Sequence, residues 1–375
     1  MMTKAERIEA ALNLEKPDHV PFAPFIGGYS ATFLGKTQAE YYKTPETEIL
    51  MIGEFFDACG GWDGLVPNAM VSNELVHMLG LKFPVQIKYP GVDLPDNYGM
   101  QTHEGEFIKF GDYDKIIEEG YNAYYFDDLV YRLYNLEKGG LDAKVRHMQK
   151  CVALVESEWG KRDVKFVYGA GAVHPFFKLS LGRSMIRFTE DLFYKPDVVE
   201  KAMDRMTDEL IEEILEGINN TGNKHLFLVE ERAPAYLYPL HIFERFWMPF
   251  TERIVDAMWS NGIRTTFHID MDWSKNLPYF RKLPAKSVCL QLDSTTDIFN
   301  AKKEVGDHCC IMGDVPATML SIGTPQEVED YCKELVREVG YNGGFILSTG
   351  CECPIDCKKE NFLKMCEVAE NSHKL

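Results

Sequence analysis

Histidine, cysteine and carboxylate side chains recur directly after apolar segments of this sequence. These side chains together suit Zn²⁺, which in catalytic sites takes three protein ligands and keeps one position open. The candidate metal ligands are His268, Cys351, Glu230, Glu231 and Asp270. We expect the ion to be held by His268, Cys351 and one of the three carboxylates. His268, Glu230 and Asp270 are also the candidates for catalysis.

Each candidate also has a structural interpretation. A histidine at a strand end is commonly a hydrogen-bonded structural residue, and an acid in that position often caps the following helix. Asp314, which follows the run CCIMG, fits the capping interpretation. His174, in the segment HPFF, is interpreted as packing.

The elements that carry these residues alternate in the second half of the chain. Strands are predicted at residues 225–229, 264–269, 287–292, 309–312 and 344–348, with helices at 241–260, 324–340 and 359–372 between or after them. Thr324, Pro325 and Glu327 have the spacing of a capping box with proline at the first helical position. This alternation indicates βαβ units, and the fully apolar strands suit parallel pairing with both faces buried.

The first half of the chain is less regular. Strands are predicted at residues 19–25, 64–67 and 164–168, and the alternation in 104–110 predicts a hairpin. About eight core strands favour an α/β fold built as a TIM-like (β/α)8 barrel. We therefore predict a single domain over residues 1–375, with an irregular N-terminal part.

Such a barrel would explain how distant residues form one site. His268 and Cys351 are 83 positions apart (351 minus 268), so only the fold could join them. On the predicted strand count they would sit on the sixth and eighth strands. Their side chains would then converge at the carboxyl ends of the strands, where barrel enzymes place their active sites.

Composition excludes several classes of function. The formal net charge of -18 repels phosphate backbones, so nucleic acid is not an expected partner. No apolar run approaches the ~20 residues that cross a membrane, and the N-terminus lacks an apolar signal core. A cytoplasmic protein without membrane association is therefore expected, with its ten cysteines as thiols.

The order of several short motifs resembles the uroporphyrinogen decarboxylase superfamily over nearly the whole chain. The motifs are KPDHVP at 16–21, YKPD at 194–197, PLHIFERFWMP at 239–249, His268 in its strand, GDVP at 313–316, and Asn361 in the final helix. The fold of that superfamily is a (β/α)8 barrel, which agrees with the strand count.

The decarboxylases of that superfamily carry an arginine-containing motif close after the first strand. Here the corresponding stretch is PFIGGY at 24–29, and no arginine occurs between Arg7 and Arg132. Binding a tetrapyrrole with many carboxylates would be poorly compensated without guanidinium groups. Porphyrinogen decarboxylation is therefore disfavoured.

The other branch comprises zinc-dependent methyltransferases that work with corrinoid proteins. One subgroup methylates thiols and uses a His-x-Cys motif with a distant cysteine; His268 and Cys351 match it, but Asp270 stands where the nearer cysteine would be. A second subgroup resembles the first methyltransferases of O-demethylase systems, whose zinc sites use glutamates with a histidine. Glu230 or Glu231, with Glu244 and His268, offers such a set.

The resemblance implies a corrinoid-dependent methyltransferase. Its expected reaction moves a methyl group from a methoxylated aromatic ether to a cob(I)alamin protein, with zinc as Lewis acid. Three alternatives stay open: a methylcobamide:thiol methyltransferase, a decarboxylase-like lyase acting on a smaller substrate, and a non-catalytic corrinoid-binding or tetrapyrrole-binding protein.

The expected substrate site and partners follow from this implied reaction. Phe25, Tyr29 and Tyr236 are expected to line an apolar slot for an aromatic ring. The chain lacks an Asp-x-His-x-x-Gly cobalamin motif, so the corrinoid is expected on a partner protein. The other partner is a small-molecule methyl donor or acceptor, and a homodimer is left open.

Overall fold

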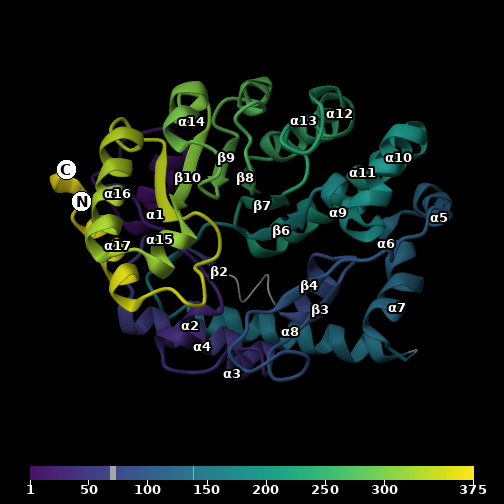
Figure 1. Cartoon of the computed structure of the whole chain (residues 1–375), viewed down its shortest axis with the longest axis horizontal. Helices are drawn as coiled ribbons and strands as arrows, with labels where there is room; N and C mark the ends of the chain where they lie inside the picture. Colours follow the sequence, from purple (N-terminus) through teal and green to yellow (C-terminus); the bar gives the residue numbers. More distant parts are fainter. Residues whose placement is uncertain (68–72, 138) are drawn as a thin grey trace.

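Parallel strands form the centre of the molecule and helices surround them (Figure 1). The structure is a computed structural model that describes residues 1–67, 73–137 and 139–375. Six strands form one parallel sheet in the order β11-β10-β9-β8-β7-β6. These strands are β6 (Ala170–Val173), β7 (His225–Glu230), β8 (Arg264–Ile269), β9 (Val288–Leu292), β10 (Cys310–Val315) and β11 (Phe345–Thr349).

A smaller parallel sheet completes the ring. It contains β1 (Phe25–Ile26), β2 (Gly64–Pro67) and β5 (Lys165–Phe166). On one side the chain just before β1 joins β11, because Phe22 bridges Leu347 in parallel and the Ala23 N–H donates to the Leu347 carbonyl.

The other side of the ring is closed by a single extended segment. Residues 165–173 contain both β5 and β6, and the N–H of Gly169 between them donates to the carbonyl of His225 in β7. The pairings therefore agree with the predicted TIM-like (β/α)8 barrel. In this ring β8 is the fifth strand and β11 the eighth, so the predicted sixth position of His268 is wrong.

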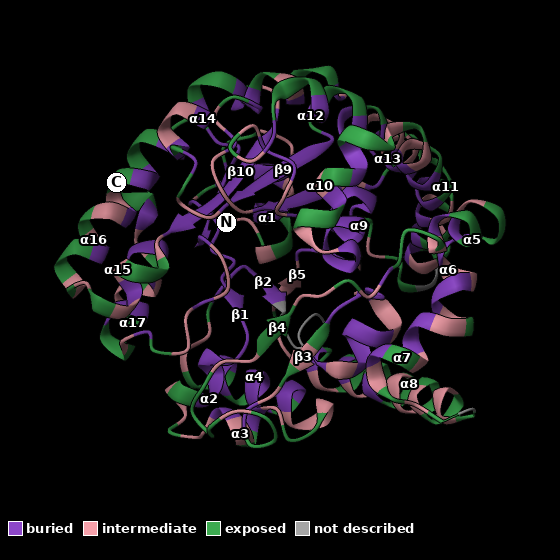
Figure 2. Cartoon of the chain, turned by 45° about the vertical axis from the view of Figure 1, so that its right-hand side comes forward, coloured by how far each residue is buried: buried purple, intermediate pink, exposed green. Residues whose placement is uncertain are grey.

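Two cores lie on the two faces of the strands. Successive side chains of a strand point to opposite faces. In β7, Phe227 and Val229 belong to the core inside the barrel, whereas Leu226 and Leu228 belong to the core between the strands and the helices. Figure 2 shows the result: buried strands lie at the centre, and most of the helices around them have a buried inner face and an exposed outer face.

The first helix, α1 (Lys4–Leu12), lies against the amino ends of the strands. It begins with the capping box of Thr3 and Glu6, and Ile8, Ala11 and Leu12 pack into the core inside the barrel. Glu9, on the same helix, bonds to His225 at the start of β7. The helix therefore covers the end of the barrel opposite to the candidate site.

The remaining helices connect and cover the strands. They are α2 (Tyr29–Phe33), α3 (Gln38–Tyr41), α4 (Pro45–Cys59), η2 (Val76–Gly80), α5 (Asp112–Glu119), α6 (Tyr121–Tyr124), η3 (Tyr125–Leu129), α7 (Val130–Tyr134), α8 (Gly140–Trp159), α9 (Pro175–Arg183), α10 (Met185–Tyr194), α11 (Pro196–Thr221), α12 (Leu240–Phe246), α13 (Met248–Ser260), η4 (Leu277–Lys282), α14 (Ile298–Val305), α15 (Ala317–Ile322), α16 (Pro325–Glu334), η5 (Leu335–Val339), α17 (Lys359–Glu370) and η6 (Ser372–Lys374). The predicted capping box at Thr324 does begin α16.

The hairpin lies earlier in the chain than predicted. It is formed by β3 (Gln86–Lys88) and β4 (Gln101–His103), which pair antiparallel. The alternation in residues 104–110 has another cause, because Glu104 and Glu106 are ion-pair partners of Arg232 and Arg183.

Within residues 1–67, 73–137 and 139–375, no helix has both the length and the apolar character that crossing a bilayer requires.

Candidate functional site

Three of the predicted ligands meet at the carboxyl ends of two strands. His268 lies in β8, Asp270 follows that strand, and Cys351 follows β11. The His268 Nε2 atom is 3.6 Å from the Cys351 Sγ atom and 3.5 Å from Asp270 Oδ1. One potential ligand atom from each residue lies within 4.8 Å of the other two. The barrel thus brings together residues that the sequence separates widely.

The ring of His268 is held by its neighbours. On β9, Gln291 is the register partner of His268, and its Oε1 atom lies 3.1 Å from His268 Nδ1. The ring of Phe227 stacks on the imidazole at 5.5 Å, and Phe25 meets it edge-on at the same centroid distance. An Nδ1–H donated to Gln291 leaves Nε2 free to face Cys351 and Asp270. Sequence reasoning missed Gln291 and Phe227, although the period of two along β7 to β9 could have placed them beside His268.

A strained turn directs Asp270. Met271 has a φ of 73°, in the left-handed region that side chains other than glycine rarely adopt. Its N–H donates to Asp293 Oδ2 at 2.9 Å, and its carbonyl accepts from the Thr296 hydroxyl. The indole of Trp273 donates to the Asp270 carbonyl at 2.8 Å. These bonds stabilise the turn, so the position of Asp270 does not depend on its own side-chain contacts.

Close backbone approach fixes the start of the segment with Cys351. A Cβ atom on Gly350 would lie 3.1 Å from the backbone of Asp293 and 3.2 Å from the Asp314 carbonyl oxygen. The Gly350 N–H donates to the Val315 carbonyl in β10. Glycine before Cys351 therefore lets β11 leave the barrel tightly against its neighbours.

The electrostatics of this group favour the binding of a cation. Burial and the carboxylate of Asp270 raise the pKa of the Cys351 thiol well above its usual range. Burial and Asp270 also raise the pKa of Glu231 to about 8. Burial raises the pKa of Asp270 itself, opposed by His268. Asp270 Oδ1 is buried and lacks a hydrogen-bond partner among the described residues. A divalent cation would satisfy this oxygen and favour the charged forms of all three groups.

Glu230 is not brought into this group. It is fully buried on the opposite face of β7 from Glu231, as expected for neighbouring positions at a strand end. Its carboxylate accepts from the Trp247 indole at 3.0 Å and the Arg232 N–H at 2.8 Å, and lies 3.2 Å from His174 Nδ1. The side chain therefore links the strand to the helix layer. Glu231 is the adjacent carboxylate that faces Asp270.

The predicted aromatic slot is only partly assembled. Phe25 contacts His268, as described above. Tyr29 has no exposed surface and packs against Phe55 and Phe362 in the outer core, with ring centroids 5.7 and 5.4 Å away. Tyr236 is 71% exposed in the chain after β7. The structure therefore places Tyr29 away from His268, because the first turn of α2 points it into the helix layer.

Glu244 also lies apart from the group. It is exposed on α12 and accepts a hydrogen bond from the hydroxyl of Tyr279. The glutamate-rich zinc set considered above is therefore not assembled around His268. The group that the fold does assemble contains nitrogen, sulfur and oxygen donors, as expected for a Zn²⁺ site.

Comparison with known proteins gives a family and a fold. A model described as uroporphyrinogen decarboxylase (URO-D) matches residues 135–372. Two curated relatives are both described as methylcobamide:CoM methyltransferase MtbA. The protein from Methanosarcina mazei is 24% identical over 239 residues, covering 64% of this chain and 66% of the relative. The protein from Methanosarcina acetivorans is 26% identical over 182 residues, covering 48% and 51%.

A solved structure supports the same architecture over the full length. The structure described as a methyltransferase from Methanosarcina mazei superposes with a TM-score of 0.73 and covers 100% of both chains, at 16% identity. At that identity the likeness concerns the fold. In sequence, the chain spans just under two thirds of one curated relative and about half of the other.

Proposed function

This chain belongs to the uroporphyrinogen decarboxylase family, and from that membership we propose that it is a corrinoid-dependent methyltransferase with a zinc site. The observation that carries the proposal is the meeting of His268, Asp270 and Cys351 at the barrel mouth. The two curated relatives, described as methylcobamide:CoM methyltransferases, support methyl transfer involving a methylcobamide.

Some residues of the proposed site would bind the metal ion, and others would orient these ligands. His268, Cys351 and Asp270 would hold the ion, and Glu231 is a second carboxyl group beside them. When bound, zinc supplies Lewis acidity toward an oxygen or sulfur atom of the substrate. Gln291 and Phe227 keep the imidazole oriented, and the strained turn at Met271 keeps Asp270 in place. An oriented ligand set lowers the reorganisation needed during the reaction.

For the substrate we propose an aromatic methyl ether. In this reaction the bond between the methyl carbon and the ether oxygen breaks, and its electron pair stays on the oxygen as a phenolate. The methyl group is transferred to the cob(I)alamin of a partner protein, which contributes the electron pair of the new bond. Asp270 in place of a second thiolate favours this direction, because oxygen donors leave more Lewis acidity on zinc than thiolates do.

A thiol acceptor is the second candidate. Transfer to a thiol is supported by the two relatives, which are described as methylcobamide:CoM methyltransferases. In this direction the substrate thiol would take the open position, and zinc would lower its pKa. The same three side chains would hold the ion, so the two candidates differ in substrate and direction.

Metal content and two assays test the proposal. We expect His268→Ala to lower the zinc content by about one ion per chain, because a catalytic site of this type holds one ion. Methyl transfer is followed from 2-methoxyphenol to cob(I)alamin, and from methylcobalamin to 2-mercaptoethanesulfonate, by the absorbance of the corrinoid. Turnover in the first assay would support the ether donor, and turnover in the second assay would support the thiol acceptor.

A matched variant controls for nonspecific effects. His241→Ala changes an exposed histidine on α12 and should alter neither zinc content nor turnover. Full zinc content and unchanged turnover in His268→Ala would contradict the proposal. Release of carbon dioxide from a carboxylic acid substrate by the zinc-free protein would favour the lyase alternative instead.

A further inference from the structure

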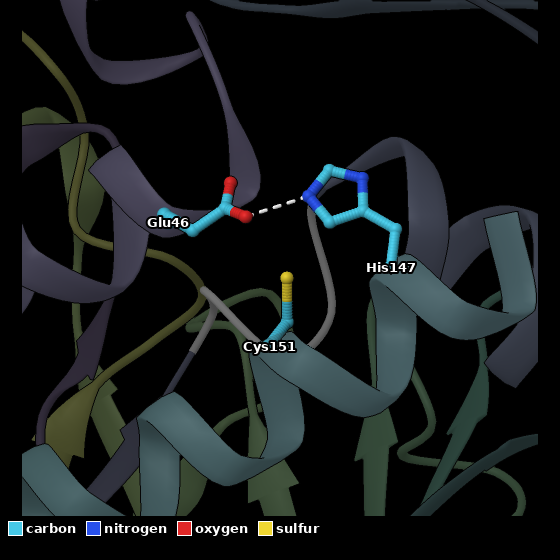
Figure 3. Close-up of side chains that lie close together, drawn as sticks. All are labelled: Glu46, His147 and Cys151. Carbon is cyan, nitrogen blue, oxygen red and sulfur yellow. Dashed lines mark hydrogen bonds and ion pairs between the residues drawn. The ribbon is translucent and has the colours of Figure 1, made fainter. Parts of the chain in front are cut away.

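A second group of metal-ligand side chains lies between two helices of the outer layer. His147 and Cys151 are one turn apart on α8, so they share a face of that helix. Glu46 comes from the first turn of α4, and its Oε1 atom is 2.6 Å from His147 Nε2. One ligand atom from each residue lies within 4.8 Å of the other two. Figure 3 shows the Cys151 sulfur directed toward the space beside the histidine and glutamate.

Cys151 is buried, whereas His147 and Glu46 are partly exposed to solvent. Cys151 is 4% exposed, whereas the side chains of His147 and Glu46 are 38% and 37% exposed. An ion can therefore reach the imidazole and the carboxylate from solvent and then contact the sulfur below them. Solvent can also supply a water molecule as a fourth ligand.

The Cys151 sulfur lies next to the histidine–glutamate pair, and that pair does not by itself require a buried thiol beside it. A divalent cation bonded to the imidazole, the carboxylate and the sulfur would account for the presence of all three donors at one place.

The dimensions suit a tetrahedral zinc site. Zinc bonds of about 2.0–2.3 Å to nitrogen, oxygen and sulfur place the ligand atoms roughly 3.3–3.7 Å from one another. The sulfur would move slightly toward the other two atoms. The histidine and glutamate atoms would move apart, which these partly exposed side chains can do by small rotations. Sulfur and imidazole donors favour Zn²⁺ over Ca²⁺ and Mg²⁺.

From this geometry we infer that Glu46, His147 and Cys151 form a second Zn²⁺ site, which fastens α4 to α8. The two helices already pack against each other. The site lies apart from His268 and Cys351, so it would act on stability rather than on methyl transfer. This inference does not depend on the proposed function.

Metal counting in a background without the first site tests the inference. The double variant His268→Ala/Cys351→Ala of the full chain is stripped with a chelator, dialysed against Zn²⁺ and measured by mass spectrometry. We expect about one zinc ion per chain to remain, as for a single tetrahedral site. Adding Cys151→Ala should remove that ion. Adding Cys59→Ala, which changes a half-buried thiol at the end of α4, should not.

Cobalt replacement gives a second measurement on less altered protein. With Co²⁺ in place of zinc, the absorption from thiolate-to-cobalt charge transfer should fall to roughly half in Cys151→Ala, since two sites with one thiolate each would contribute to it in the native chain. Chelation should also lower the melting temperature of the double variant, and not after Cys151→Ala is added. A double variant that binds no zinc, or a cobalt spectrum unchanged by Cys151→Ala, would overturn the inference.

Discussion

At the scale of single residues, the site depends on groups outside the proposed metal ligands. Gln291 accepts from His268 Nδ1, and Phe227 stacks on the same imidazole. A ligand that is held in one tautomer and one orientation loses less entropy when it binds a metal. Outer contacts of this kind typically contribute 10–100-fold in metal affinity.

Gln291→Leu should weaken zinc binding without unfolding the barrel. The leucine keeps the volume of the side chain but removes the acceptor of the His268 hydrogen bond, so the affinity for zinc should fall by about 10–100-fold. Competition with a chromophoric chelator measures this change. Gln291→Glu keeps an acceptor at the same place and should bind at least as tightly as the native chain. Equal affinities for the leucine and glutamate variants would argue against an orienting role.

The raised pKa of Glu231 predicts how the metal-free protein responds to pH. This pKa is about 8 in the folded chain and about 4.3 in an unfolded chain. Between these values the folded state binds more protons, so stability falls as pH rises from about 4.3 to 8. Glu231→Gln should flatten this part of a plot of melting temperature against pH.

Two controls separate Glu231 from general effects. Glu216→Gln, at an exposed position on α11, should leave the slope unchanged. Zinc should reduce the slope in the native chain, because a cation favours the ionised carboxylate. A slope that is the same in native protein and Glu231→Gln would assign the pH dependence to other groups.

At the scale of elements, α1 is joined to the barrel by one buried carboxylate. Asp63 precedes β2 and pairs with the guanidinium of Arg7 on α1, both with little exposed surface. Its second oxygen accepts from the Phe22 N–H at 3.0 Å. The Asp63 side chain therefore joins α1, the segment around Phe22 and the start of β2.

Asp63→Asn should be among the more damaging polar substitutions. It removes one of the two anions paired with the buried Arg7, while Asp18 stays bonded to the guanidinium, so the loss should be below the roughly 3–5 kcal/mol of a fully broken buried pair. The midpoint of urea denaturation measures the loss. Asp163→Asn removes the partner of Lys4, but the side chain of Asp163 is 88% exposed. That control should change stability by less than about 1 kcal/mol. Similar losses in both variants would mean that burial at Asp63 does not matter.

The elements also show what the sequence could predict. The strands that became β7 to β11 were predicted to within about three residues at each end, because their apolar runs reflect burial on both faces. The capping box at Thr324 was predicted from spacing alone and is confirmed. Local chemistry decides these features, so a local pattern is sufficient.

Features that depend on three-dimensional neighbours were harder to predict. The position of Tyr29 depends on Phe55 and Phe362, which no local pattern connects to it. Glu230 and Glu231 are adjacent in sequence, and only the register of β7 separates their directions. Cys151 was counted only among the ten thiols, because Glu46 lies on another helix and no local pattern connects the two.

At the scale of the whole molecule, the barrel depends on pairing between its first and last strands. Across this seam the Ala23 N–H donates to the Leu347 carbonyl, and the Leu347 N–H donates to the Pro21 carbonyl. The Ser348 hydroxyl donates to the Ala23 carbonyl. Ala23→Pro removes the N–H that Leu347 accepts, with an expected loss of about 3 kcal/mol. Ala23→Gly keeps this donor and should lose about 1 kcal/mol. Calorimetry compares the two, and equal melting temperatures would mean that the seam bond contributes little.

The seam also sets an order of events during synthesis of the protein on the ribosome. The segment around Phe22 leaves the ribosome early, but its partner Leu347 is made more than 300 residues later. Until then one edge of the growing sheet has unpaired backbone groups, and Cys351 has not yet joined His268. A nascent chain that stops before β11 should therefore recruit chaperones at this edge and bind no zinc at the barrel mouth.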